Sequence, residues 1–192
     1  RSVNRDTSGM ELPGGSDPDS PVAVKLTPTE ATPESFKEYG QVIEASPDGQ
    51  EFGPHDAQLN LSHGTPRFYI MRLKNRSIRF STITHHAKVT QCLGSIGGNA
   101  WYLGVSKPSI LGFGESGRAR HSSAPPGVDD VRAFRVSGPK FLKLSIGTWH
   151  AGPLFKADAM DFYNLELSNT NVEDHTTHDF KKKDGVVFSI DE

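Results

Sequence analysis

Short segments rich in β-branched and aromatic residues alternate with glycine- and proline-containing segments along most of this chain. Such runs are typical of strands, and the connections between them are mostly short and polar. We expect strands over residues 22–26, 41–45, 67–73, 79–84, 88–93, 99–105, 131–136, 141–146 and 160–167. The spacing favours hairpins, including one at Gly138-Pro139, over a parallel sheet with alternating helices. The pattern therefore predicts an all-β fold built as an antiparallel barrel.

One short helix is predicted near the amino end. Thr32 can cap it, and Pro33 suits the first helical position. Phe36 and Tyr39 would share one face, and Gly40 would provide a left-handed end. No other segment has comparable helix signals.

Two segments lack strand or helix signals. Residues 1–20 are polar and rich in glycine and proline, which predicts a flexible leader or a vector-derived tail. We expect residues 21–192 to form a single domain, since one core commonly holds roughly 100 to 200 residues. Residues 106–130 form a long irregular stretch, which could be a surface insertion or a lid over a site.

The composition of the chain limits the kinds of partner that it is expected to bind. The net charge of −2, from 21 basic and 23 acidic residues, offers no extended positive field for nucleic acid. No apolar run approaches the roughly 20 residues needed to span a membrane, so we expect a soluble, cytoplasmic protein. The single cysteine, Cys92, cannot form an internal disulfide and is interpreted as a small core residue.

Candidate chemistry lies in two distant stretches. The first holds His85, His86 and Gln91, and the second holds Trp149 and His150. Adjacent residues of a strand point to opposite faces, so only one of His85 and His86 can enter a barrel. Imidazole suits zinc, nickel, copper or iron, whereas a glutamine oxygen is a weaker ligand. The divalent ions expected are nickel, manganese or zinc. The alternative is a hydrogen-bonded polar cluster without metal.

Other polar and aromatic residues have less direct signals. Trp149, Tyr102 and Tyr163 could line a ligand pocket or fill the core. Glu166 lies in an otherwise apolar strand and needs a partner if it is buried. His175 and His178 are three apart, a spacing that could hold metal on a helix turn, but their polar neighbours favour a surface loop. The remaining histidines are interpreted as residues of turn-rich segments: His55, His63 and His121.

The two stretches resemble the two sequence motifs of the cupin barrels. In that register His86 takes the position of the second histidine, Gln91 the acidic position and Gly98 the closing glycine. Gly147 and His150 match the glycine and histidine of the second motif. The resemblance selects His86 over His85 and implies a metal set of His86, Gln91 and His150. Thr84 stands in place of the first histidine, so a degraded site without metal stays an alternative.

Longer segments resemble the ureidoglycolate lyase family, which consists of small cupins. They are residues 36–44, residues 131–138, Trp149-His150 followed by Pro153-Leu154-Phe155, and Asp161-Phe162 leading to Glu166. The resemblance implies cleavage of ureidoglycolate to glyoxylate and urea in allantoin and purine breakdown, a homodimer and a divalent metal.

Carried over by position, the resemblance makes His86, His150 and Glu166 catalytic, and Gln91, Trp149 and Tyr102 substrate-binding. The chain departs from the family after the carboxylate, where residues 167–169 replace Arg-Gly-Gly. Two alternatives therefore stay open: a cupin isomerase or lyase for another small hydroxy acid or sugar, and a cupin that only binds a small molecule.

Overall fold

The computed structural model describes residues 19–113, 119–122 and 124–192, with side chains described outside residues 110–123. The leader expected over residues 1–20 lies almost entirely outside the described residues. The same holds for part of the stretch at residues 106–130, where a lid was one interpretation. Neither expectation can be compared with the structure at those positions.

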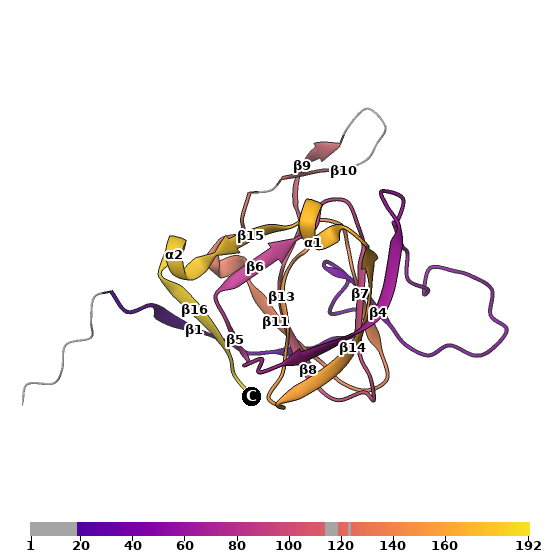
Figure 1. Ribbon diagram of the computed structural model, residues 1–192, viewed down its shortest axis with the longest axis horizontal. Helices are drawn as coiled ribbons and strands as arrows, with labels where there is room; N and C mark the ends of the chain where they lie inside the picture. Colours follow the sequence, from indigo (N-terminus) through magenta and orange to yellow (C-terminus); the bar gives the residue numbers. More distant parts are fainter. Residues whose placement is uncertain (1–18, 114–118, 123) are drawn as a thin grey trace, which may run out of the picture.

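Two larger sheets supply most of the strands (Figure 1). The six-stranded sheet has the order β15 (Thr176–Asp179), β6 (Thr82–His85), β13 (Trp149–Leu154), β8 (Trp101–Ser106), β11 (Arg132–Val136) and β2 (Thr29–Glu30). The five-stranded sheet has the order β3 (Gly40–Ile43), β12 (Phe141–Leu144), β7 (Gln91–Ser95), β14 (Ala159–Leu167) and β4 (Pro66–Lys74). The prediction of an all-β fold is confirmed at this level. Backbone pairing among the described residues leaves each sheet open.

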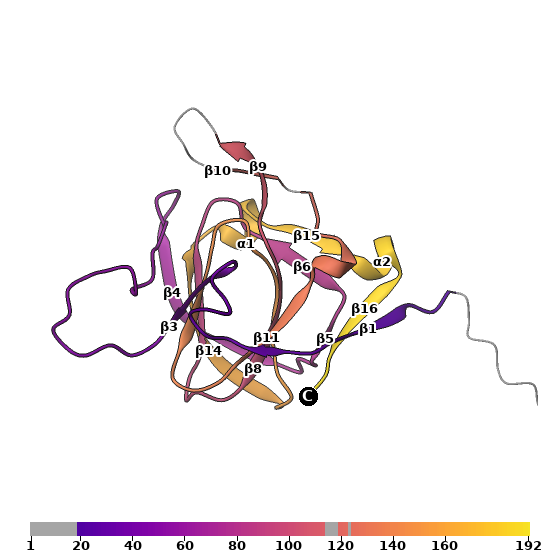
Figure 2. The same cartoon turned by 180° about the vertical axis from the view of Figure 1, so that it is seen from behind.

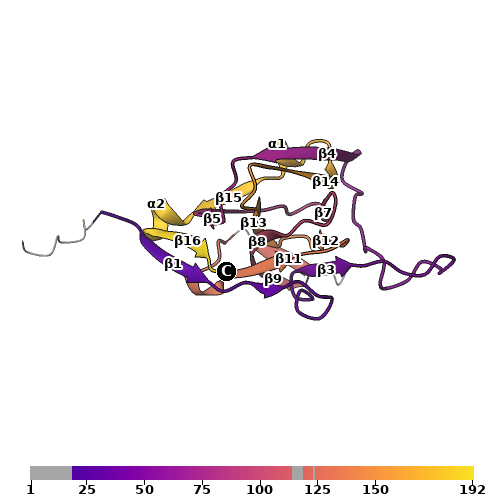
Figure 3. The ribbon, with the colours of Figure 1, turned by 90° about the horizontal axis from the view of Figure 1, so that it is seen from below.

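Smaller elements flank these sheets. A three-stranded sheet joins β1 (Val22–Leu26), β16 (Val186–Ile190) and β5 (Arg79–Phe80), and Figure 3 shows β1 and β16 together at one end of the molecule. The hairpin of β9 (Ser109–Phe113) and β10 (Ala119–Ser122) projects away from the two larger sheets (Figure 2). A 3-10 turn, η1, covers Val128–Asp130, and two short helices lie near the carboxyl end: α1 (Thr170–Glu173) and α2 (Phe180–Asp184).

The connections differ from the expected hairpins. Strands β6, β7 and β8 alternate between the two larger sheets, and so do β12, β13 and β14. The hairpin predicted at Gly138-Pro139 is wrong, because this turn joins β11 of one sheet to β12 of the other. Short polar connections can cross between facing sheets as readily as they can turn within one, so connection length alone did not distinguish the two.

Strands overlap all nine of the predicted segments. The segment at residues 79–84 is divided at Ser81 into β5 and β6, which belong to different sheets. Strands β2, β9, β10, β15 and β16 were missed. β9 and β10 fall within the stretch interpreted as irregular, and β15 and β16 lie on either side of the lysine run at residues 181–183. Hydrophobic patterning thus located most strands but not their partners.

The predicted amino-terminal helix is wrong. Residues 33–39 form turns, and the chain enters β3 at Gly40. Thr32 does act as a cap, since its hydroxyl accepts a hydrogen bond from the Ser35 amide at 3.0 Å. Phe36 and Tyr39 instead pack around Phe134, with ring centroids 5.0 and 5.4 Å from it. Tertiary packing of these rings therefore outweighs the local helix signals.

Gly40 is needed for a reason other than the expected left-handed conformation. It pairs with Leu144 of β12, and a Cβ atom at Gly40 would lie 1.9 Å from the carbonyl oxygen of Lys143. The left-handed prediction is wrong, because Gly40 is a strand residue without positive φ. A close backbone approach accounts for the glycine here.

The core divides into two clusters. One contains Phe36, Trp101, Phe155 and Phe162 between the larger sheets, and the other packs around Trp149 and the strands near the carboxyl end. Cys92 is buried, as expected, and burial raises the pKa of its thiol to about 11. No helix in the described part of the chain combines the length and apolar character needed to cross a membrane.

Candidate functional site

A cavity of about 510 Å³ is lined by strands of both larger sheets. Its walls come from β4, β7 and β14 on one side and from β6 and β13 on the other. The polar side chains that line it are Tyr69, Asn75, Arg76, Ser77, Arg79, Thr82, Thr84, His86, Gln91, His150, Asn164, Glu166, Asn171 and His175. A concave space in which polar groups from several strands converge is the usual place for a small-molecule site, and this cavity is more polar than most such sites.

The two predicted histidines meet in this cavity. The His86 and His150 ring centroids are 5.2 Å apart, although 64 positions separate them in the chain (150 − 86). The Gly147 amide donates to the His86 carbonyl at 2.8 Å, and Thr84 pairs with His150 across β6 and β13. Both rings are buried. Strand pairing therefore fixes the geometry that the sequence suggested.

Asp174 holds the bend that follows β6. Its carboxylate accepts hydrogen bonds from the amides of Ala87 and Lys88 at 2.7 and 2.8 Å. Its carbonyl oxygen lies 2.5 Å from Nδ1 of His86. A carbonyl only accepts, so Nδ1 of His86 must carry the proton. The lone pair of the neutral ring is then on Nε2.

The Nδ1 atom of His150 also faces a backbone carbonyl, as Nδ1 of His86 does. Its Nδ1 lies 3.4 Å from the carbonyl oxygen of Thr148, a longer contact that favours the same tautomer. Burial lowers the pKa of His150 to about 3, and the neighbouring His86 ring adds to this effect. Burial also lowers the pKa of His86, against the opposing influence of Asp174. Both imidazoles are thus neutral at pH 7 with the lone pair on Nε2, and His86, whose pKa is lowered less than that of His150, is the stronger proton acceptor of the two.

Glu166 is completely enclosed but well supplied with donors. Its carboxylate accepts hydrogen bonds from the Tyr69 hydroxyl at 3.1 Å and from Gln91 Nε2 and Asn171 Nδ2, both at 3.4 Å. Asn164 links Gln91 to Tyr69 through two contacts of 3.0 Å. This answers the question of a partner for Glu166, because three polar side chains offset the burial of its charge.

Gln91 keeps one unused atom. Its Nε2 group donates to Asn164 and Glu166, whereas its buried Oε1 has no hydrogen-bond partner among the described residues. A buried orphan acceptor is costly unless something else binds it. Its place on the cavity wall makes Oε1 available to an N–H donor of a ligand or to a cation.

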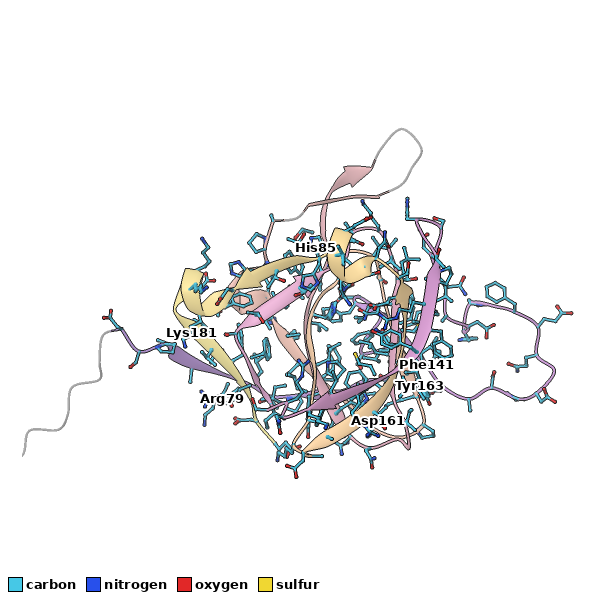
Figure 4. All side chains as sticks on the ribbon, viewed as in Figure 1. Arg79, His85, Phe141, Asp161, Tyr163 and Lys181 are labelled. Atoms are coloured by element: carbon cyan, nitrogen blue, oxygen red, sulfur yellow. The ribbon has the colours of Figure 1, made fainter. Side chains whose placement is uncertain are left out.

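Three of the sequence candidates lie away from this cavity. His85 lies at the end of β6 near α1 (Figure 4) and packs edge-on against Trp149, with ring centroids 4.4 Å apart. Trp149 belongs to the second core cluster. Tyr102 lines a separate cavity of about 720 Å³ together with Arg135 and Lys156. The structure therefore brings neither Trp149 nor Tyr102 to the two imidazoles.

His175 and Asn171 are cavity residues that the sequence interpretation missed. The His175 ring centroid lies 5.7 Å from that of His86, and its Nε2 contacts the Thr177 hydroxyl at 3.1 Å. His175 had been interpreted as a surface-loop residue, and it is indeed exposed. Only the pairing of β15 with β6 places it at the cavity. Asn164 was detectable, since it lies two residues before Glu166 and shares its face of β14.

The other histidines lie outside the cavity or outside the described side chains. His55 and His63 are exposed. His178 pairs with Asp184 at 2.8 Å. The side chain of His121 is not among those described.

Comparison with known proteins adds no identification. The sequence matches no protein-family model and no curated protein. Any assignment therefore depends on the cavity and on the sequence resemblance.

The donor set offers a divalent metal fewer strong ligands than a conventional site. Within the described residues, no three histidine, cysteine, aspartate or glutamate side chains are arranged to hold a metal ion. The expected set adds the neutral Oε1 of Gln91 to two imidazoles, each with Nδ1 at a backbone carbonyl. Metal-binding histidines commonly have their other ring nitrogen at such a carbonyl. The unpartnered Oε1 of Gln91 is likewise available to a metal ion. The residues thus fit a weakly held ion.

The low pKa values of the two histidines make stability depend on pH. Histidine in the unfolded chain titrates near 6.5, whereas the folded His150 titrates near 3. Below about pH 6.5 the unfolded chain binds protons that the folded protein does not bind. We expect the free energy of unfolding to fall by up to about 1.4 kcal/mol per pH unit from His150 as the pH drops from 6.5 toward 3.

Urea unfolding at pH 7.5, 5.5 and 4.5 measures this dependence. A His150→Gln variant should lose stability less steeply with acid than the wild-type protein. His55→Gln removes an exposed imidazole and should keep the wild-type slope. Equal slopes for the wild type and His150→Gln would contradict the prediction.

Proposed function

We propose that this protein is a cupin-type lyase that cleaves ureidoglycolate into glyoxylate and urea. The observation that carries the proposal is the convergence of His86 and His150, from separate strands, beside the Gln91 and Glu166 network in one cavity. The arrangement of two facing sheets, with strands that alternate between them, is compatible with a cupin barrel. The resemblance to the ureidoglycolate lyase family supplies the substrate.

The reaction needs one proton removed and one supplied. The substrate carries a hydroxyl and a urea nitrogen on the same carbon. Removing the hydroxyl proton forms the carbonyl of glyoxylate, while the carbon–nitrogen bond breaks and its electron pair goes to the urea nitrogen, which takes up a proton. A neutral imidazole can take the first proton and return it to the nitrogen, so that the enzyme ends unchanged.

The described side chains divide these tasks. His86 and His150 present neutral rings whose Nδ1 atoms face backbone carbonyls, which leaves Nε2 for proton transfer. Gln91 Oε1 can accept a hydrogen bond from the ureido N–H, because it has no partner of its own among the described residues. Glu166, held by Tyr69 and Asn171, positions Gln91 through its Nε2 group.

A divalent metal would be held by Nε2 of His86, Nε2 of His150 and Oε1 of Gln91. Nickel, manganese and zinc all accept imidazole nitrogen. When bound, such an ion would polarise the hydroxyl and carboxylate oxygens of the substrate. The side chains of the cavity would orient the substrate and transfer the proton whether or not the ion is bound.

Release of urea and glyoxylate from ureidoglycolate by the purified protein tests the proposal. We expect one equivalent of each product, formed faster than in the uncatalysed control. Metal analysis of protein purified without chelator, and an assay after dialysis against chelator, measure the metal dependence. Product formation equal to the control would refute the lyase assignment. Binding of a small hydroxy acid without turnover would then favour a binding protein or an enzyme for another substrate.

Homodimer formation is part of the same proposal. The outer face of the five-stranded sheet exposes Phe68, Ile70 and Tyr163, and the last of these lies beside Phe141 in Figure 4. Exposed apolar patches of this kind often mark contacts between proteins. They support a paired state for this chain, which sedimentation velocity would detect.

A further inference from the structure

Arg67 lies next to Glu166, one of the residues that line the cavity. It pairs directly with Glu166 across β4 and β14. Alternation along β4 places Arg67 on the same side of the strand as Tyr69 and Met71, and both of these line the cavity. The Arg67 side chain is exposed and is not itself among the residues that line the cavity, which it adjoins through Tyr69.

The guanidinium of Arg67 stacks on the Tyr69 ring. Its Cζ atom is 3.7 Å from the ring centroid. Tyr69 in turn donates to Glu166 and accepts from Asn164, so the ring that supports Arg67 is itself fixed by the buried network. Stacking occupies the flat face of a guanidinium and leaves its in-plane N–H donors free for a planar acceptor.

No carboxylate among the described residues forms an ion pair with Arg67. Arg72, on the same strand, differs, because two of its nitrogens bind Asp161 at 2.8 and 2.9 Å. Arg135 likewise pairs with Glu30 at 3.1 Å. Arg67 is therefore a positioned cation with unused donors, beside a cavity that a small molecule could enter.

The charges of the cavity explain what such a cation would do. Glu166 places a carboxylate within the cavity, where Tyr69, Gln91 and Asn171 donate to it. An anionic ligand would meet repulsion from Glu166 unless a cation lay nearby. Arg76, in the β4–β5 connection, and Arg79, the first residue of β5, also line the cavity, but they follow the carboxyl end of β4, whereas Arg67 lies near its amino end.

We propose that Arg67 binds the carboxylate of the ligand through its in-plane N–H groups. The site would then select small monocarboxylates that carry a hydroxyl or ureido group on the adjacent carbon, with that group directed toward Gln91 and the imidazoles. The identity of the substrate rests on the proposed function. The carboxylate-binding role of Arg67 can be tested without any turnover.

Glycolate and glycolamide have nearly the same shape, but only glycolate is charged. Comparing their binding therefore separates the contribution of the ligand's charge from that of its shape. Titration calorimetry or NMR should show that the wild-type protein prefers glycolate. We expect Arg67→Gln to weaken glycolate binding by about 10- to 100-fold and to leave glycolamide binding unchanged. Arg67→Lys should recover part of the loss, because it keeps the charge without the fork of donors. Arg72→Gln, the matched control from the same strand, should bind glycolate like the wild type.

The outcomes distinguish this inference from the lyase proposal. Equal glycolate affinity in the wild type and Arg67→Gln would overturn it, as would wild-type protein that binds no glycolate or shows no preference over glycolamide. Arg67-dependent binding of glycolate without urea release would leave the inference standing and refute the lyase. If urea is released, Arg67→Gln should raise KM by a similar factor and change kcat much less.

Discussion

Replacing His150 by alanine is expected to lower kcat for urea release by about 10³-fold, within the 10²- to 10⁴-fold contribution typical of a proton-transferring side chain. His150 is buried at the cavity wall, 5.2 Å from His86 between ring centroids. Its removal would take away one of the two neutral imidazoles that can exchange a proton with the substrate. Single-turnover assays with saturating ureidoglycolate would measure the loss directly.

The comparison needs a variant that leaves the cavity intact. His55→Ala removes an exposed imidazole away from the site and should retain the wild-type rate. Thermal unfolding should be recorded for both variants, because His150 is enclosed and its loss leaves a space. A folded His150→Ala protein with wild-type kcat would show that the two histidines do not perform the chemistry. His86→Ala should resemble His150→Ala, since the two rings act in one cavity.

Substituting Gly40 by alanine should destabilise the fold by about 3 kcal/mol or more, which is large for a single methyl group. The added Cβ would lie 1.9 Å from the Lys143 carbonyl oxygen and 2.9 Å from its carbon. These are backbone atoms of the paired strand β12, so they cannot move aside as a flexible side chain could. Relief would require separation of β3 from β12 at the edge of the five-stranded sheet.

Gly53→Ala provides the matched control. A Cβ at Gly53 would have the Glu51 carbonyl oxygen as its nearest neighbour, at 3.9 Å, which is an ordinary contact. Urea unfolding should therefore place Gly53→Ala within about 1 kcal/mol of the wild type and Gly40→Ala well below it. Similar stabilities for the two variants would contradict the close approach at Gly40.

The candidate site divides into residues that the sequence indicated and residues that it did not. His86, Gln91, His150 and Glu166 could be selected from motif spacing, and the structure brings them to one cavity. Asp174 could not be selected in this way, because it lies 88 positions from His86 in the chain. Its carbonyl oxygen contacts the His86 ring, and its carboxylate binds the Ala87 amide. A residue type common in turns gives no signal for such a contact.

Among the predicted site residues, the aromatic residues near the motifs were placed least correctly. Trp149 is adjacent to His150, and adjacency in a strand sends the two side chains to opposite faces. One face meets the cavity and the other meets the second core cluster. Because Trp149 and His150 are neighbours in a strand, their side chains point to opposite faces, and only His150 reaches the cavity.

Local sequence patterns were sufficient to predict that the protein is built from strands, where most of the strands lie, and which polar residues could take part in binding or catalysis. Alternation of hydrophobic residues and the placement of glycine and proline are local properties, so the chain displays them directly. Three features became visible only in the folded molecule: consecutive strands alternate between two sheets, residues 33–39 form turns, and His175 and Arg67 lie near the buried network. These features depend on pairing and packing between residues far apart in the chain, and such contacts outweigh local preference because they bury more surface and satisfy more hydrogen bonds.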